Sequence, residues 1–196
     1  MNLLNRKTPK QRMLEKLTNV KEHQDLIDDL TTLQNEISVG YNTRVIAVTS
    51  IRNERLAAAF ADGMAVTYGI NGAKTLVVDA NLYMPRLATV LNASGESLKV
   101  DDKVDAIFMN KEVYPADVYK GGAIHKLIKE HEGEYDHFIL IVPEMRDHKE
   151  IYLLKDILDA IILVAQRSMT KKKDIFEAVR FFRANNLPIA KTVVVK

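Results

Sequence analysis

The residues most able to do chemistry follow an apolar stretch that ends at Val48, because such stretches form buried strands and ligands of α/β proteins bind beyond their carboxyl ends. A loop that cradles nucleotide phosphates needs glycines, a lysine for the β- and γ-phosphates, and a Ser or Thr for magnesium. The segment after Thr49 has no glycine and no lysine, and it consists of Ser50, Ile51, Arg52, Asn53, Glu54, Arg55, Leu56, Ala57 and Ala58. Residue chemistry alone therefore predicts no nucleotide or cofactor site here.

A second candidate group lies at the end of the apolar run 75–79, where Asn81 follows Asp79 two residues later. A carboxylate at this point can position magnesium, but a lone aspartate after a strand is more often a turn or cap residue. The histidines predict no metal site. The spacing of six between His125, His131 and His137 suits shared ligands on neither a helix nor a strand.

The elements that position these residues alternate along the chain. Short apolar runs typical of buried strands lie at 44–49, 75–79, 106–109, 137–142, 160–165 and 191–195. Helical patterns lie at 54–68, 117–131, 150–158 and 170–184. A further helix is predicted within 13–38, where one face holds Leu26, Leu30, Leu33 and Ile37. This alternation predicts a single α/β domain, with a mostly parallel sheet and helices on both of its faces.

Length and composition exclude several classes of protein. The 196 residues suit one domain, and 47% hydrophobic with 28% charged residues is ordinary for a globular protein. A net charge of +2 does not indicate a nucleic-acid binder, and a chain without cysteine has no disulfide framework. No apolar run reaches the ~18 residues of a membrane span, so we expect a cytoplasmic protein. We interpret residues 1–12 as a flexible basic arm and 13–196 as the domain.

Two motifs at a defined spacing resemble the bacterial tyrosine kinases of the capsule and exopolysaccharide family, which are relatives of the Min and Par P-loop ATPases. In that family a strand ends in Thr-Ser, and Pro-Gly-x-Gly-Lys-Ser/Thr-Thr follows after two residues. A later strand reads Lys-Thr-Leu, two hydrophobic residues and Asp-x-Asp. Here Thr49-Ser50 and the run from Lys74 to Asp79 match, and residues 51–73 fit between them without insertion or deletion.

The resemblance also implies what has been replaced in the phosphate loop, or Walker A motif. Asn53 stands at the family's proline, Glu54 and Leu56 at its glycines, Ala57 at its lysine, and Ala58 at its magnesium-binding Ser or Thr. Each lost group normally contributes ~1.5–3 kcal/mol to the free energy of nucleotide binding, whereas the whole binding free energy at micromolar affinity is only about 8 kcal/mol. The resemblance therefore implies a degenerate Walker A motif and no bound nucleotide.

The other motifs are degraded in the same sense. Asp79 is retained, but Asn81 stands at the second acidic position, and Ile141 stands where the third motif carries its metal-organising aspartate. Tyr135-Asp136 and Pro115-Ala116-Asp117 resemble the polysaccharide branch more closely than the Min and Par branch. These losses imply a pseudokinase without catalytic residues, in which Asp79 and Asn81 are vestigial.

Two groups of surface candidates remain. Asp28, Thr31 and Gln34 match positions at which the family carries Glu-x-x-Arg-x-x-Arg, a motif that docks neighbouring subunits. A basic run at the start of the last helix comprises Arg167, Lys171, Lys172 and Lys173. Such a run is usually a solvated face, but it also suits an anionic lipid or an acidic tail of a membrane partner. Lysines at a helix N-terminus oppose the helix dipole, which favours a use for them.

The resemblance thus implies a non-catalytic scaffold that regulates capsule or exopolysaccharide biosynthesis. Its expected partner is a membrane polysaccharide co-polymerase or a related kinase, bound at the inner face of the membrane, and homo- or hetero-oligomers are compatible with the sequence. Two alternatives stay open: a residual or partner-dependent tyrosine kinase or ATPase in polysaccharide biosynthesis, and a Min/Par-like positioning adaptor.

Overall fold

A seven-stranded sheet forms the centre of the computed structural model, which describes residues 24–38, 43–85, 98–109, 115–120 and 122–195. Its strands are β1 (Val45–Ser50), β2 (Thr75–Asp79), β3 (Leu98–Lys99), β4 (Val104–Phe108), β5 (His137–Ile141), β6 (Ala160–Gln166) and β7 (Ile189–Val195). The strand order is β3-β4-β2-β5-β1-β6-β7. All neighbours are parallel except β3, which is antiparallel to β4.

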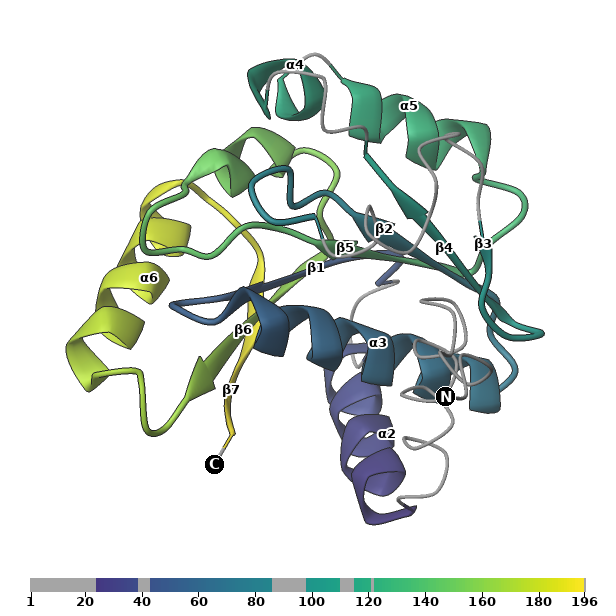
Figure 1. Cartoon of the computed structure of the whole chain (residues 1–196), viewed down its shortest axis with the longest axis horizontal. Coiled ribbons are helices and arrows are strands. Elements are labelled where there is room, and N and C mark those ends of the chain that lie inside the picture. The colour runs from purple at the N-terminus through teal and green to yellow at the C-terminus, as the bar shows by residue number, and fades with distance from the viewer. Residues whose placement is uncertain (1–23, 39–42, 86–97, 110–114, 121, 196) are drawn as a thin grey trace, which may run out of the picture.

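Helices cover both faces of this sheet (Figure 1). They are α2 (Gln24–Ser38), α3 (Glu54–Ile70), α4 (Pro115–Tyr119), α5 (Ala123–Glu130), the 3-10 helix η2 (Glu150–Leu154) and α6 (Lys172–Ala184). Residues of α2 and α3 pack on one face, and residues of α4, α5, η2 and α6 pack on the other. The predicted α/β fold, a mostly parallel sheet between two helical layers, is confirmed.

The central strands are buried on both faces because each contributes to two cores. In β1, Ile46 and Val48 face α2 and α3, whereas Val45 and Ala47 face the layer that contains α6. This alternation follows from the two-residue period of a strand. It also explains why the central strands read as continuous apolar runs. The edge strand β7 differs, since its residues are half-buried or exposed.

Helix α2 lies against α3 through a tight apolar contact. A Cβ atom on Gly63 of α3 would lie 3.1 Å from Leu30 Cδ1, so glycine permits this close approach. Leu30, Leu33 and Ile37 are buried as the helical pattern predicts, while the side chain of Leu26 lies outside the described residues. The predicted helix 13–38 is confirmed from Gln24 onwards. Residues 1–23, including the predicted arm, lie outside the described part of the chain.

Two local predictions are wrong, and one short strand was not predicted. The helix expected over 117–131 is two helices, α4 and α5, because Gly122 adopts a left-handed φ of +78°, through which an α-helix does not continue. The helix expected over 150–158 is the short 3-10 helix η2. The two-residue strand β3 was not predicted, because its pairing with β4 leaves no periodic pattern in so short a run.

Candidate functional site

The turn after β1 forms the amino-terminal cap of a helix. Strand β1 ends at Ser50 and α3 begins at Glu54, so three residues connect them. Asn53 is the N-cap, and its Oδ1 accepts a hydrogen bond of 3.1 Å from the backbone N–H of Leu56. The Asn53 N–H itself donates to Ser50 Oγ at 3.1 Å. Asparagine is among the preferred N-cap residues because its side chain satisfies a free helical N–H group.

This cap uses groups that a phosphate loop would offer to a ligand. The backbone N–H groups of Leu56 and Ala57 also bond to Asn53 O at 3.1 and 3.2 Å. The Asn53 amide Nδ2 donates to Gln166 Oε1 at 2.9 Å, which ties the turn to the end of β6. Ala57 and Ala58, at the lysine and Ser/Thr positions of the family, are buried in the core beneath α3. The N–H groups of Asn53, Leu56 and Ala57 are thus bonded within the turn.

Negative charge gathers beside this turn. Glu54 begins α3, and its Oε2 is buried without a hydrogen-bond partner among the described residues. Burial raises the pKa of Glu144 to about 7, with further contributions from the hydrogen bond and charge of Asp147 and from the charge of Glu54. A phosphate that approached the turn would meet these carboxylates, whereas a working phosphate loop presents N–H groups and a lysine.

The side chains of Asp79 and Asn81 hold the turn after β2. Asp79 is 1% exposed, and its Oδ1 accepts from the N–H of Asn81 at 3.2 Å. Asn81 Oδ1 accepts in turn from Tyr83 N at 3.2 Å and Met84 N at 3.1 Å, as an Asx-turn does. Ile141 lies opposite Asp79 in the β2–β5 register and is 2% exposed. The position beside the retained aspartate is therefore apolar.

Tyr83, two residues after Asn81, contacts the segment after β5. Its ring stacks on His148 with centroids 3.7 Å apart, and its hydroxyl donates to Glu150 Oε1. Desolvation, followed by the hydrogen bond and charge of Glu150, raises the pKa of Tyr83 to about 12. The deeper Tyr119 hydroxyl donates to Ala80 O at 2.6 Å. These contacts fill the space over β2 with the chain's own side chains.

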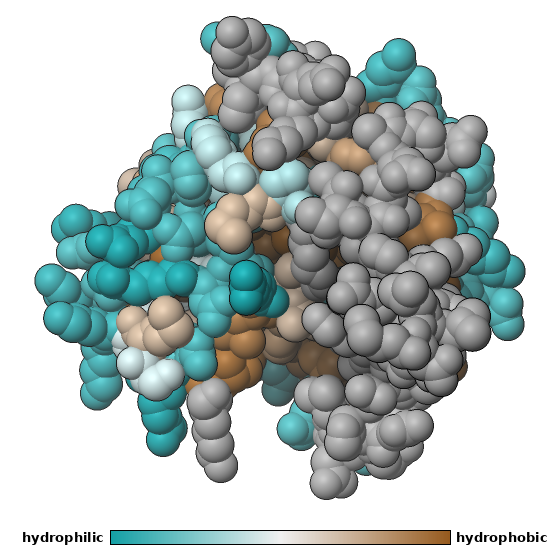
Figure 2. Space-filling view, in the orientation of Figure 1, coloured by the Kyte–Doolittle hydropathy of each residue, from teal (hydrophilic) through white to brown (hydrophobic). Residues whose placement is uncertain are grey.

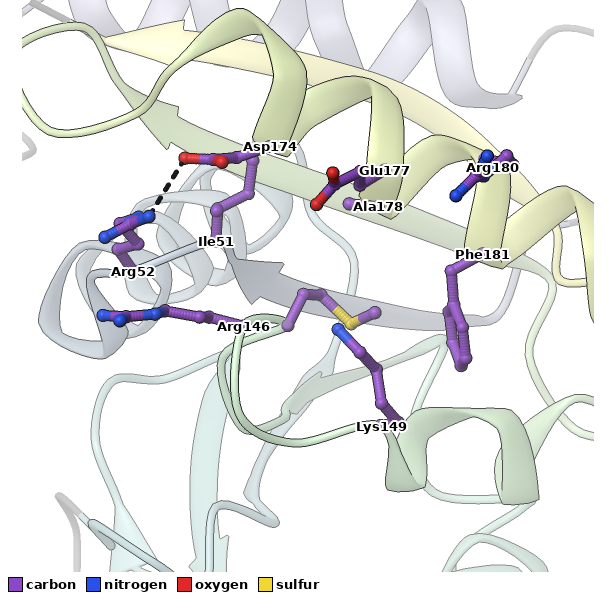
Figure 3. Close-up of a pocket in the computed structure, with 10 residues that line it drawn as sticks. Ile51, Arg52, Arg146, Lys149, Asp174, Glu177, Ala178, Arg180 and Phe181 are labelled. Atoms are coloured by element: carbon purple, nitrogen blue, oxygen red, sulfur yellow. Dashed lines mark ion pairs between the residues drawn. The ribbon is translucent and has the colours of Figure 1, made fainter.

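A pocket opens on the other side of the same turn, between it, the segment after β5, and α6 (Figure 3). Its volume is about 410 Å³. It is lined by Ile51, Arg52, Met145, Arg146, Lys149, Asp174, Glu177, Ala178, Arg180 and Phe181. Within the described ranges, no cluster of three or more His, Asp or Glu residues is placed to hold a metal ion.

No protein-family model matches the chain, and no curated protein matches it. Solved structures do match it. The VpsO kinase domain has a TM-score of 0.72 at 16% identity, with 91% of this chain and 97% of that chain covered. The BceF tyrosine kinase domain has a TM-score of 0.74 at 14% identity, covering 87% and 76%. The chain has the fold of bacterial tyrosine kinase domains. A ParA family ATPase from Chlorobium tepidum, with TM-score 0.56, 16% identity and coverage of 78% and 73%, shares the wider fold.

Within this tyrosine kinase fold, the predicted subunit-docking residues separate into two groups. Asp28 and Thr31 lie on the outer side of α2, exposed and half-buried respectively. Gln34 is 3% exposed, and its Nε2 donates to Met64 O at 2.9 Å inside the α2–α3 contact. Gln34 is therefore a packing residue within this chain and is not accessible to a neighbouring subunit, which corrects its assignment as an interface candidate.

The predicted basic run is exposed, as a docking surface requires. Arg167 follows β6, and Lys171, Lys172 and Lys173 lie at the amino-terminal end of α6. Exposed apolar side chains lie close by in the sequence, with Met169 50% and Phe176 72% exposed. In the space-filling view, hydrophilic side chains dominate the surface over α6, with smaller apolar areas among them (Figure 2). No helix among the described residues is long and apolar enough to span a bilayer.

The pocket residues on α6 and after β5 were not predicted as a site. Arg180 and Phe181 read only as part of a helical pattern, and Arg146 and Lys149 only as polar residues after a strand. A possible signal is their position, since both segments follow the carboxyl ends of strands that neighbour β1. Which of these side chains face one cavity depends on how α6 lies across the sheet.

Proposed function

We propose that this protein is a pseudokinase: a non-catalytic scaffold with a tyrosine kinase fold that binds a protein partner and regulates capsule or exopolysaccharide biosynthesis. The turn after β1 carries the proposal. It has the place of a phosphate loop in the sheet, yet Asn53 caps α3 there and the N–H groups of Asn53 and Leu56 are bonded within the chain.

Electrostatics support the same conclusion. The triphosphate of ATP is strongly anionic, and at this turn it would meet Glu54 and Glu144 without a lysine at position 57. The turn's Arg52 lines the pocket beside α6 and is paired with Asp174. Opening the cap would also expose hydrogen-bonding groups that are now satisfied. Removal of an N-cap alone costs about 1 kcal/mol. The interactions of a bound nucleotide would have to exceed both the electrostatic repulsion and the cost of opening the cap before its binding became favourable.

The basic surface at the start of α6 supports a protein partner. On α6 the exposed Phe176 follows Lys172 and Lys173 by four and three residues, which places them on one side of the helix. This combination of charge and apolar area suits an acidic segment with apolar side chains. We propose that this segment belongs to a membrane polysaccharide co-polymerase or a related kinase. The protein would then lie at the inner face of the membrane through its partner. Asp28 and Thr31 on α2 are the proposed contact for a second subunit.

Thermal unfolding with ATP tests the non-catalytic part of this proposal. We expect no change in Tm at millimolar ATP with magnesium, because a ligand that binds only the folded state raises Tm when its concentration exceeds Kd. ATP without magnesium and magnesium alone serve as controls. A clear increase that requires both would refute the proposal. Phosphotransfer by a reconstituted complex that is lost in Asp79→Ala would instead support a partner-dependent enzyme.

Partner binding is tested with matched charge reversals. The first variant carries Lys171→Glu, Lys172→Glu and Lys173→Glu. The control carries Lys126→Glu, Lys129→Glu and Lys155→Glu, three exposed lysines that lie away from α6. We expect the α6 variant alone to lose co-purification with the cytoplasmic segment of a polysaccharide co-polymerase. Equal binding by both variants would show that the basic surface is not the contact.

A further inference from the structure

The pocket beside the turn combines positive charge with an aromatic wall. Three separate segments contribute cations: Arg52 from the turn, Arg146 and Lys149 from the segment after β5, and Arg180 from α6. Two carboxylates, Asp174 and Glu177, also line it. Four cations and two carboxylates line the pocket, and Asp147, outside the lining, lies 3.8 Å from Arg146 Nε and offsets part of this positive charge. The pocket is therefore suited to an anion.

One of these cations is held in place by the protein. Arg52 Nη2 lies 3.3 Å from Asp174 Oδ2, as the dashed line in Figure 3 marks. Its Nε is buried without a hydrogen-bond partner among the described residues. Figure 3 shows Arg146 extending beside Arg52 at the same end of the pocket. The pocket lining thus includes two guanidinium groups, the side chain best suited to phosphate oxygens.

The other end of the pocket carries an aromatic ring beside a cation. The ring of Phe181 lies there with Lys149, whose Nζ is 5.4 Å from the ring centroid (Figure 3). Met145 is buried in the pocket floor, and Ala178 of α6 is buried close to it. An aromatic ring seated here would contact Phe181 and the Met145 thioether, both of which favour aromatic neighbours. The pocket thus offers guanidinium groups for a phosphate and an aromatic side chain for a ring.

We propose that this pocket binds a phosphorylated tyrosine side chain of the partner. Its phosphate, with a charge of about −1.5 to −2 at neutral pH, would lie on Arg52 and Arg146, and its ring would lie against Phe181. The surplus of cations over carboxylates in the lining favours this anion, and the pocket volume of about 410 Å³ lies within the ordinary range of ligand sites. The inference rests on the proposed function, in which a tyrosine kinase is a partner.

The probe is a fluorescein-labelled peptide with a single phosphotyrosine flanked by Gly and Ser, and the measurement is fluorescence anisotropy with the full chain. We expect it to bind at least tenfold more tightly than the same peptide with tyrosine or with phosphoserine. AMP is added as a competitor that carries both a phosphate and an aromatic base, and inorganic phosphate is added as a competitor that carries the anion alone. Displacement of the peptide by AMP at an equal or lower concentration would assign the pocket to nucleotides and overturn the proposal.

Variants locate the binding site. Arg146→Ala and Lys149→Ala change exposed side chains, so they leave Tm unchanged, and each is expected to weaken phosphotyrosine binding about tenfold or more. Lys155→Ala, an exposed lysine outside the pocket, is the matched control. Phe181→Leu should weaken binding of phosphotyrosine but not of phosphoserine, since it removes only the ring contact. Wild-type affinity in Arg146→Ala and Lys149→Ala, or no preference for phosphotyrosine, would overturn the proposal.

These results are independent of the ATP experiment. A chain that fails to bind phosphotyrosine and shows no shift with ATP remains a non-catalytic scaffold without this recognition site. A chain that binds phosphotyrosine and also ATP with magnesium has the pocket but is not a pseudokinase.

Discussion

The replacement Asn53→Ala tests whether the turn is a helix cap or a ligand loop. Alanine removes both hydrogen bonds of the Asn53 side chain and leaves the backbone of the turn in place. The lost N-cap bond from Leu56 N–H corresponds to about 1 kcal/mol. The lost bond from Nδ2 to Gln166, half-buried, adds about 0.5–1.5 kcal/mol. We therefore expect the free energy of unfolding to fall by about 2 kcal/mol, a decrease in Tm of roughly 4–8 °C for a chain of this length.

Urea unfolding followed by far-UV circular dichroism measures this change. Asn53→Asp keeps the accepting oxygen and removes only the donor to Gln166, so it should retain the cap contribution and lose at most about 1 kcal/mol. Gln166→Ala removes the same bond from the other partner. The reasoning is refuted if Asn53→Ala unfolds at the same urea concentration as the wild type, because the turn would then not depend on its cap.

Three further predictions follow from buried groups. Ile141→Asp places an aspartate where the resembled kinases carry one, but it buries a second carboxylate beside Asp79. Chemical denaturation should therefore show a free energy of unfolding lower by about 3 kcal/mol or more, and calorimetry should show no magnesium binding. Glu144 has a pKa raised to about 7, so its contribution to stability is fully present below its ordinary pKa and is lost as pH rises through about 7. The Tm of Glu144→Gln should therefore fall less than that of the wild type between pH 5 and 8, and parallel curves would contradict this. Phe182→Ala empties a fully buried site between α6 and the sheet and should cost about 3–5 kcal/mol in urea unfolding, whereas Phe176→Ala, on the exposed side of the same helix, should cost less than about 0.5 kcal/mol.

The sequence by itself determined the sheet and the absence of glycine and lysine from the turn after β1. Buried parallel strands need apolar side chains on both faces, so β1, β2, β5 and β6 are visible as apolar runs, and helices that cover them show a helical period. The absence of glycines and lysine can also be recognised from the local sequence, because a phosphate loop requires each of them at a particular backbone position. The expectation that Asp79 forms a turn also depended only on neighbours in sequence, and the structure confirms it.

Only the tertiary structure decided which distant side chains share a surface. Gln34 has a polar side chain on a helix, and it is buried because Gly63 lets α2 approach α3 closely enough for its amide to reach Met64 O. Arg52, Lys149 and Phe181 are more than thirty residues apart in sequence, and they line one pocket because β5, β1 and β6 are neighbours and α6 crosses beside them. Strand order and helix placement arise from packing between distant segments, and no local pattern of residue types records them.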